Sequence, residues 1–408
     1  MHNKGLTSFI VLLFIALFFL CSLFNSLKKF HGNYSGLLRI STLFAAQNPF
    51  LKHNPALYKT LLLASDTGYD GQLYYFIAFD PLLHQFADQP EQYQKVVDAV
   101  PYRYSRIIYP LLTNLLSNGN PYLFPQVMIW ILLFSLIAGA FFFNRILVFH
   151  NIHPAWTLLY GIVPSFIFAL TYGTPEPLAA MALLAGLFFY NTRRFWISAL
   201  FLSAAILTRE TSIIAILCVA IFEMKTQKNR RGAGILLMAL IPFIAWRIFL
   251  TYRLWDLYGW HSLYYSAGNV GLPLKGIIDL YSTIFAGQYL RYIIPAGILL
   301  PIFIALIVVI ATRIFWRRRN LYALIGSLYA VLLLCATYDK IWIHVANAER
   351  TCFEAFLMFF LAVLSSESFK SRNYYRYAFT AILFLYCAVL STAHQSFRFG
   401  LMPWRLFN

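Results

Sequence analysis

Long apolar runs, separated by short polar or basic segments, constrain the fold of this chain more than any other feature. The first run covers 8–27, and further runs lie near 126–147, 154–173, 176–191, 195–223, 233–251, 293–312, 321–337, 350–366 and 377–393. A segment that crosses lipid must satisfy its backbone polar groups internally, so each spanning run is expected to be a helix. We therefore predict an all-α polytopic membrane protein with a single transmembrane domain over residues 1–408.

The composition also favours a lipid environment. Hydrophobic residues make up 60% of the 408 residues and charged residues only 12%, whereas about a quarter of the residues in a soluble domain are charged. One water-soluble core could not bury this much apolar surface. Asn25 and Ser26 form a poor small-residue cleavage site, so we interpret the run 8–27 as a first transmembrane helix that stays attached.

The basic residues predict the orientation of the chain. The net charge is +17. Lys and Arg gather in short segments at 193–194, 224–231, 313–320 and 368–376. The positive-inside rule places these segments in the cytoplasm, so the charge calls for no nucleic-acid partner. The outer segments are then 28–125, 172–177, 252–292 and 337–349. Most acidic residues lie in these outer segments, and 28–125 is expected to form interfacial helices.

The run 195–223 is too short for two full spans and long for one, and Arg209-Glu210 interrupts its middle. Two half-helices that enter the membrane and return would keep both basic ends in the cytoplasm; a single tilted helix is the alternative. Neighbouring residues do not face each other on a helix, so Arg209 and Glu210 are expected to find different partners and to support the cavity. The predicted bundle has about nine full spans and this hairpin.

Cofactor motifs are absent from the sequence. Five cysteines lie in or beside apolar runs without a CxxC pair, and there is no P-loop, Rossmann or HExxH pattern. We expect no disulfide framework, no zinc site and no cofactor, although a divalent metal stays open.

The segment Ser65–Tyr75 contains two carboxylates four residues apart, each near a glycine. Glycine lets the backbone turn tightly beside a ligand, and a carboxylate there can accept a proton from a sugar hydroxyl. Asp70 and Asp66 are therefore candidate catalytic residues. The candidate substrate contacts that follow are Gln72, Tyr74 and Tyr75, because aromatic rings suit the apolar faces of sugars. The alternative is an Asx-turn with a helix cap.

Arg103 and Arg106 lie three residues apart, on one face if the segment is helical. Two guanidinium groups suit a phosphate, and Arg350, at the mouth of the run 350–366, is a third candidate for the donor phosphate. The alternative is anchoring of Arg and Tyr side chains at the membrane interface.

Three further residues complete the predicted site. Glu176 lies between two prolines that indicate a helix start, where a carboxylate is favoured, so we assign it a supporting role. Trp260 and His261 lie in the outer segment 252–292 and are candidate substrate contacts. A lone histidine is, however, more often a satisfied hydrogen-bonding residue.

Three motifs carry a family resemblance. They are Tyr69–Tyr75 (YDGQLYY), Arg103–Leu112 (RYSRIIYPLL) and Thr208–Thr211 (TRET). Together with one helix, a long acidic outer loop and an aromatic-rich bundle, they resemble the GT-C superfamily of membrane glycosyltransferases. More narrowly, they are similar to a bacterial group tied to cell-surface glycopolymer formation, which is distantly similar to the GPI mannosyltransferases.

The resemblance implies a polyprenyl-phosphate-linked sugar donor, an acceptor that is a glycan, lipid or protein, and a catalytic first-loop aspartate. By position that aspartate is Asp70, with Asp66 as its rival. The expected location is the bacterial inner membrane, with the site facing outside. GT-C enzymes often carry acids two residues apart, whereas here they are four apart, and the larger relatives' soluble C-terminal domain is missing. Metal dependence therefore stays open.

Two other classes of function remain. A transporter, flippase or binding subunit for a lipid-linked sugar would use the same arginines and aromatic residues without a general base, and would be expected to have broken helices in both halves. A structural assembly subunit would tolerate loss of both Asp66 and Asp70. A polymerase that joins lipid-linked repeats is a variant within the enzyme class.

Overall fold

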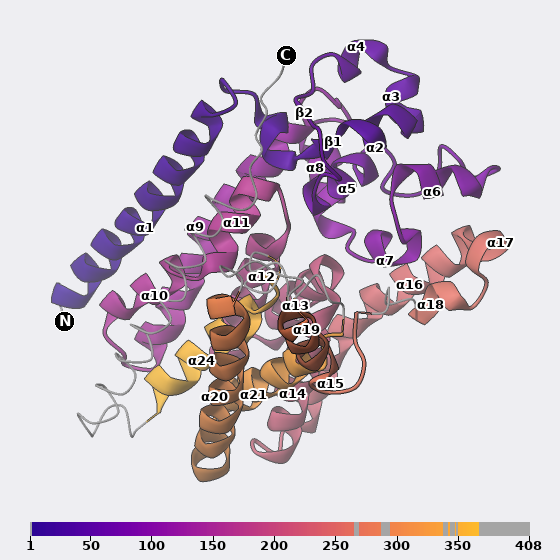
Figure 1. The fold of residues 1–408 in the computed structure, drawn as a ribbon. Coiled ribbons are helices and arrows are strands. Elements are labelled where there is room, and N and C mark those ends of the chain that lie inside the picture. The colour runs from indigo at the N-terminus through magenta and orange to yellow at the C-terminus, as the bar shows by residue number, and fades with distance from the viewer. Residues whose placement is uncertain are drawn as a thin grey trace. The chain divides into compact units, whose positions relative to one another are not determined.

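The computed structural model describes residues 2–264, 269–286, 294–337, 342, 347 and 350–366 (Figure 1). The chain divides into two compact units. Unit 1 consists of Met1–Ile162 and Phe166–Ala267, and unit 2 consists of Val163–Ser165 and Gly268–Asn408. The run 377–393, the basic segment 368–376 and the C-terminal tail lie outside the described residues.

Two long apolar helices, α1 (His2–Lys28) and α9 (Phe124–Phe149), pack against each other in unit 1. The 27 residues of α1 extend over about 40 Å, enough to cross a bilayer. One face of α1 is buried through Ile15, Phe19 and Leu23, whereas most of its other apolar side chains are exposed. Such an apolar exposed surface suits contact with lipid.

The segment between α1 and α9, which we call the first loop, folds into many short elements. They are η1 (Tyr34–Leu38), β1 (Ile40–Ser41), α2 (Thr42–Gln47), α3 (Pro49–Lys52), α4 (Pro55–Tyr58), β2 (Leu63–Ala64), α5 (Asp70–Ile77), η2 (Pro90–Gln92), α6 (Tyr93–Val96), α7 (Val100–Tyr104) and α8 (Ile108–Leu116). The strands are parallel, with Ile40 opposite Leu63 and Ser41 opposite Ala64. Figure 1 shows the helices running in different directions.

Local sequence explains why these helices start where they do. Asn33, Ser41, Asn48 and Asn54 precede η1, α2, α3 and α4, and each accepts a hydrogen bond from a backbone N–H of the first turn. Proline follows Asn48 and Asn54 at the first helical position. These caps stabilise the starts of helices that are too short to be stable alone. Every residue of α5 after Asp70 is buried, so the first loop has a core of its own.

The remaining elements of the first 264 residues follow α9. They are η3 (Pro154–Thr157), α10 (Leu158–Gly161), α11 (Pro164–Tyr172), α12 (Glu176–Asn191), α13 (Phe195–Thr208), η4 (Glu210–Ser212), α14 (Ile213–Lys225), α15 (Arg230–Leu237), η5 (Met238–Leu240), α16 (Ile241–Arg253), α17 (Trp255–Tyr258) and α18 (His261–Tyr264). Helix α12 packs along both α9 and α13.

The run 195–223 forms two helices, α13 and α14, with a break at Arg209. Arg193, just before α13, pairs with Glu223 near the end of α14 at 2.8 Å. Tyr190 and Asn229 also donate hydrogen bonds to the Glu223 carboxylate. The start of α13 and the end of α14 therefore lie together, and the break lies at the opposite end. That the pair is re-entrant in a membrane stays a prediction.

Unit 2 contains α19 (Lys275–Phe285), α20 (Ile294–Arg318), α21 (Leu321–Leu334) and α24 (Phe353–Ser365). Helices α20, α21 and α24 pack against one another. A Cβ at Gly326 of α21 would lie 3.3 Å from the Met358 Cβ of α24, so glycine permits this close approach. An isolated antiparallel bridge joins Val270 and Ala336.

The fold is that of an all-α membrane protein. Within the described residues, four helices are long and apolar enough to cross a membrane. They are Lys4–Lys28, Phe124–Phe149, Arg230–Arg253 and Leu300–Arg318. A fifth span results if Pro154–Gly161 and Ser165–Tyr172, which bend by 49°, count as one. The predicted number of about nine is not confirmed within the described residues, because α12, α13, α21 and α24 have only 13 to 16 residues and a full span needs about 20.

Candidate functional site: a network of ion pairs around α5 and α7

Asp70 is the first residue of α5, and its side chain is 22% exposed. Its carboxylate lies at the positive end of the helix dipole, which stabilises the charged form. Gly71 explains how the start of α5 is placed. A Cβ there would collide with the backbone carbonyl of Tyr172 and lie 3.1 Å from the carbonyl oxygen of Leu38. The Asp-Gly pair therefore fixes a carboxylate at a place where α5 meets two other backbone segments.

Arg103 on α7 connects Asp70 to a second acid. Its Nη1 lies 3.3 Å from Asp70 Oδ1, and its Nε lies 2.7 Å from Asp98 Oδ1. Asp98 is 60% exposed, whereas Arg103 is largely buried. Burial lowers the pKa of the Arg103 guanidinium, but Asp70 and Asp98 outweigh this effect and raise it above its ordinary value. Arg103 is therefore a permanent cation between two carboxylates.

Helix α16 holds α7 in place. The Trp246 indole N–H donates to the Tyr104 carbonyl at 2.7 Å, and Arg247 Nη1 donates to the Pro101 carbonyl at 3.1 Å. Arg247 also donates to the carbonyls of Ser262 and Leu263. This buried arginine thus ties α7 and α18 to α16.

Arg106 forms a bidentate ion pair with Glu210 through its Nε at 2.8 Å and its Nη2 at 2.7 Å. Its Nη1 donates to the Tyr74 hydroxyl at 3.3 Å, and Nη2 also donates to the Tyr102 hydroxyl. The Tyr102 ring lies under the guanidinium, with its centroid 4.4 Å away. The donor groups of Arg106 are engaged by protein groups, so it positions Glu210 and Tyr74 more directly than it could hold a phosphate.

Arg209 pairs with Glu176, the first residue of α12, at 3.0 Å, and both side chains are buried. The backbone at Arg209 is extended, with φ −154° and ψ 115°, so Arg209 and Glu210 leave the chain in different directions. The prediction that these neighbours find different partners is confirmed. The break between α13 and α14 thereby joins α12 to the segment that carries Arg106.

Asp66 forms the Asx-turn of the alternative interpretation, whereas no side chain caps the start of α5. Asp66 accepts hydrogen bonds from Arg39 Nε at 3.1 Å and from the Gly68 backbone N–H at 2.9 Å. Gly68 has a φ of +73°, which favours glycine. Burial raises the pKa of the Asp66 carboxyl, but the hydrogen bonds from Arg39 and Gly68 outweigh burial and hold it below its ordinary value.

The three predicted substrate contacts on α5 differ in their surroundings. Tyr74 lies one turn after Asp70 and bonds Arg106, so it belongs to the network. Gln72 is buried and bridges the Ser41 N–H and the Thr67 carbonyl, so it holds α5 to its neighbours. Tyr75 is fully buried against Phe79 and Phe124. We therefore leave Gln72 and Tyr75 out of the proposed substrate contacts.

Trp260 and His261 are exposed, and the Trp260 ring packs edge-on against Trp255 with centroids 5.1 Å apart. They precede the two α18 residues that bind Arg247. Arg350 belongs to unit 2, and its predicted phosphate contact stays a prediction. In the described part of the chain, no group of three His, Cys, Asp or Glu side chains could hold a metal ion.

Several residues of the network were not singled out from the sequence. Asp98 and Arg39 are the partners of Arg103 and Asp66, and nothing in their local pattern distinguishes them from other surface charges. Arg247 did carry a signal, because an arginine inside the apolar run 233–251 is costly unless it has partners.

No protein-family model, curated protein or solved structure matches this chain. No sequence or structural relative therefore assigns a role to this network.

Proposed function

We propose that this protein is an integral membrane glycosyltransferase. It moves a sugar from a polyprenyl-phosphate-linked donor to a glycan, lipid or protein acceptor of the bacterial cell envelope, at the extracytoplasmic face. Asp70 is the catalytic carboxylate. The family resemblance of the three motifs suggests this class, and one observation on the site supports it.

That observation is the contrast between Asp70 and the other acids around it. Asp66 is engaged in a turn with Arg39 and Gly68, and Glu176 is buried against Arg209. Glu210 is held by two hydrogen bonds, from Nε and Nη2 of the Arg106 guanidinium. Asp70 also forms an ion pair, with Arg103 at 3.3 Å, and it combines partial exposure with a fixed position at the start of α5. It is the acid best placed to meet a substrate hydroxyl and still keep its geometry.

The proposed reaction is an inverting displacement. The acceptor hydroxyl oxygen attacks the anomeric carbon of the donor, and its proton passes to the Asp70 carboxylate. The bond between the anomeric carbon and the phosphate oxygen breaks, and its electron pair leaves with the polyprenyl phosphate. The products are the glycosylated acceptor and the lipid phosphate, which then carries the additional negative charge.

Arg103 is the proposed phosphate contact. It lies beside Asp70, and one of its partners, Asp98, is mostly exposed and can exchange its ion pair for water contacts. A guanidinium group suits a phosphate and stabilises charge that develops as the phosphate leaves. Arg106, Arg209, Glu176 and Glu210 hold the surrounding backbone.

A second candidate is a transporter of a lipid-linked sugar. Transporters often use interrupted helices, and the described residues include interruptions at Arg209 and at the 49° bend between Pro154–Gly161 and Ser165–Tyr172. This class needs no general base, so the effect of removing the Asp70 carboxylate distinguishes the two candidate functions.

The test is Asp70→Asn in purified protein reconstituted in membranes, with sugar transfer followed from a panel of polyprenyl-phosphate sugars. Donor binding is measured in parallel, and Asp66→Asn is the matched control. We expect transfer to fall at least about 100-fold in Asp70→Asn, with donor binding retained and Asp66→Asn still active. Unchanged transfer in Asp70→Asn would remove it from the catalytic role. Movement of the donor across the bilayer without transfer would favour the transporter.

A further inference from the structure

The first loop contains a pocket with a volume of about 460 Å³. None of the ion-paired residues around Asp70 lines it. Its walls come from α3, from the chain after α5, and from the start of α9 with the turn before it. The volume lies in the range of about 300–1,000 Å³ that is usual for small-molecule sites.

Four phenylalanine rings form the apolar wall. Phe50 stacks on Phe79 at 5.0 Å and on Phe86 at 5.3 Å between ring centroids. Phe79 also packs edge-on against Phe124 at 5.2 Å. The buried Tyr75 ring supports Phe79 and Phe124 from α5. Because the rings hold one another, the wall is preorganised for a ligand.

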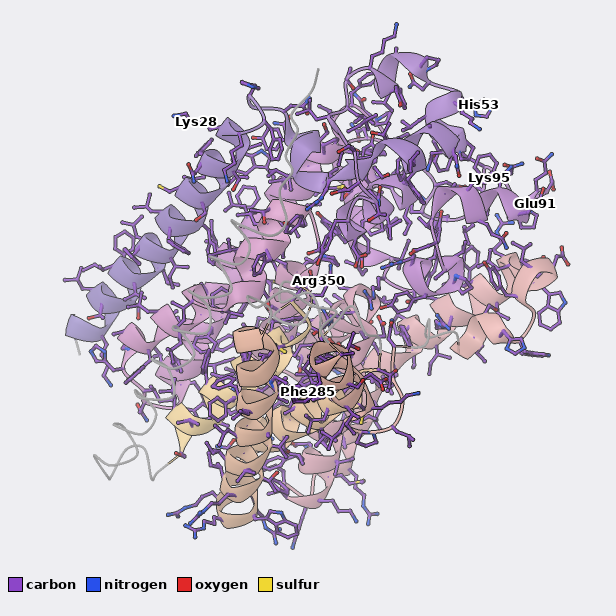
Figure 2. All side chains as sticks on the ribbon, in the orientation of Figure 1. Lys28, His53, Glu91, Lys95, Phe285 and Arg350 are labelled. Atoms are coloured by element: carbon purple, nitrogen blue, oxygen red, sulfur yellow. The ribbon has the colours of Figure 1, made fainter. Side chains whose placement is uncertain are left out.

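Three polar side chains also line the pocket, together with Gly119 and Pro121. His53 Nδ1 lies 2.7 Å from the Pro49 carbonyl, which makes Nδ1 the donor and leaves Nε2 for another contact. Figure 2 shows His53 at the surface of the first loop. The side-chain carbonyl oxygen of Asn54 accepts a hydrogen bond from the Leu57 backbone N–H, and the side-chain amide of Gln85 donates one to the Phe79 carbonyl. The Asn54 amide N–H groups and the Gln85 carbonyl oxygen can therefore meet a ligand.

No Lys, Arg, Asp or Glu lines this pocket, although the chain carries a net charge of +17. A charged ligand would lose hydration without gaining a counter-charge. A hydrocarbon chain would bury polar groups of His53, Asn54 and Gln85 without replacing their contacts with water. A neutral ligand with apolar ring faces and hydroxyl groups on its edge satisfies both parts of the lining. We propose that the pocket binds a neutral saccharide.

This site is distinct from the Asp70 network, and its proposed role goes beyond transfer. Asp70 and Tyr74 lie one turn apart on one face of α5, whereas Tyr75 lies about 100° further around the helix and supports the pocket. Saccharide binding at the pocket therefore does not require the Asp70 carboxylate, and it can be present whether or not the protein transfers sugars.

The test uses saturation-transfer NMR on the full-length, membrane-reconstituted protein. The probes are neutral disaccharides built from glucose, galactose, mannose or N-acetylglucosamine, with citronellol as an isoprenoid comparison. We expect transfer to the ring C–H protons of at least one disaccharide. Gln85→Ala, which changes an exposed side chain, and Phe86→Leu are each expected to weaken binding about tenfold. Gln89→Ala, an exposed glutamine four residues away, is the matched control.

Three results would overturn the proposal. The first is that no disaccharide shows saturation transfer. The second is that Gln85→Ala, Phe86→Leu and the parent bind the disaccharide equally. The third is that citronellol alone binds, and that its binding weakens in the same two variants. The last result would assign the pocket to an isoprenoid chain. Asp70→Asn separates this test from the test of the catalytic proposal. We expect this variant to bind the disaccharide as the parent does, even if its sugar transfer is lost or if the parent itself transfers no sugar.

Discussion

Arg106 and Glu210, which are 104 residues apart in the sequence, form a bidentate ion pair at 2.8 and 2.7 Å. Arg209, the neighbour of Glu210, reaches Glu176 instead. The break between α13 and α14 is thus fixed on two sides, to the segment before α8 and to the start of α12. The two pairs explain why charges interrupt an otherwise apolar run.

Glu210→Gln is expected to destabilise the protein. The substitution leaves the buried Arg106 guanidinium without its counter-charge, and breaking such a pair costs about 3–5 kcal/mol. Glu210 is 32% exposed, so the lower end of that range applies. Chemical unfolding in detergent measures the loss, and the exposed Glu91→Gln is the control. In the double variant with Arg106→Gln, the combined loss should be smaller than the sum of the single losses. Additive losses would show that the two side chains do not interact.

Gly71→Ala is expected to disturb the start of α5. The added methyl group collides with the Tyr172 carbonyl, which is backbone and cannot move aside as a side chain can. Overpacking of this kind costs about 1–3 kcal/mol. Gly234→Ala in α15 is the matched control, because a Cβ there meets nothing within 4 Å and alanine favours a helix. The midpoint temperature of thermal unfolding should therefore be lower than the parent's for Gly71→Ala, and equal to it or higher for Gly234→Ala.

Asp66 is expected to make stability depend on pH in the acid range. Its folded-state pKa lies below the ordinary value because of Arg39 and Gly68. The stabilisation is therefore complete above the unfolded pKa of about 3.9 and is lost as pH falls through the lower folded value. Asp66→Asn removes this dependence. The difference in stability between parent and variant should be constant near neutral pH and shrink below about pH 4, and a difference that grows on acidification would contradict the prediction.

Within the described residues, the predicted helices are confirmed, whereas the predicted number of membrane crossings is not confirmed. Hydrophobic runs near 126–147 and 176–191 correspond to α9 and α12. Composition locates such runs because apolar side chains need burial or lipid. Composition does not determine the residue at which each helix ends. The helices that are shorter than a full span end at turns or breaks, such as those after Asn191 and Thr208.

The candidate site was predictable only in part. Residues near one another in sequence, such as Asp70 and Tyr74, could be grouped by helical spacing. Pairs such as Arg103 with Asp98, Asp66 with Arg39, and Trp246 with the Tyr104 carbonyl depend on how the first loop folds. Because a short motif contains no information on that folding, the spacing of the residues alone did not separate Asp66 from Asp70, and only the family resemblance favoured Asp70.

The hydroxyl groups of Tyr74 and Tyr75 should respond differently to removal. Tyr74 accepts a hydrogen bond from Arg106, and bonds to charged groups contribute about 1.5–3 kcal/mol, so Tyr74→Phe is expected to destabilise the protein by about that amount. The buried Tyr75 hydroxyl has no hydrogen-bond partner among the described residues. Removing an unsatisfied buried hydroxyl relieves a desolvation cost, so Tyr75→Phe should be neutral or stabilising. Chemical unfolding of the two variants in the same detergent compares them directly. An equal loss in both would mean that the Tyr75 hydroxyl is hydrogen-bonded in the folded protein and would contradict the prediction.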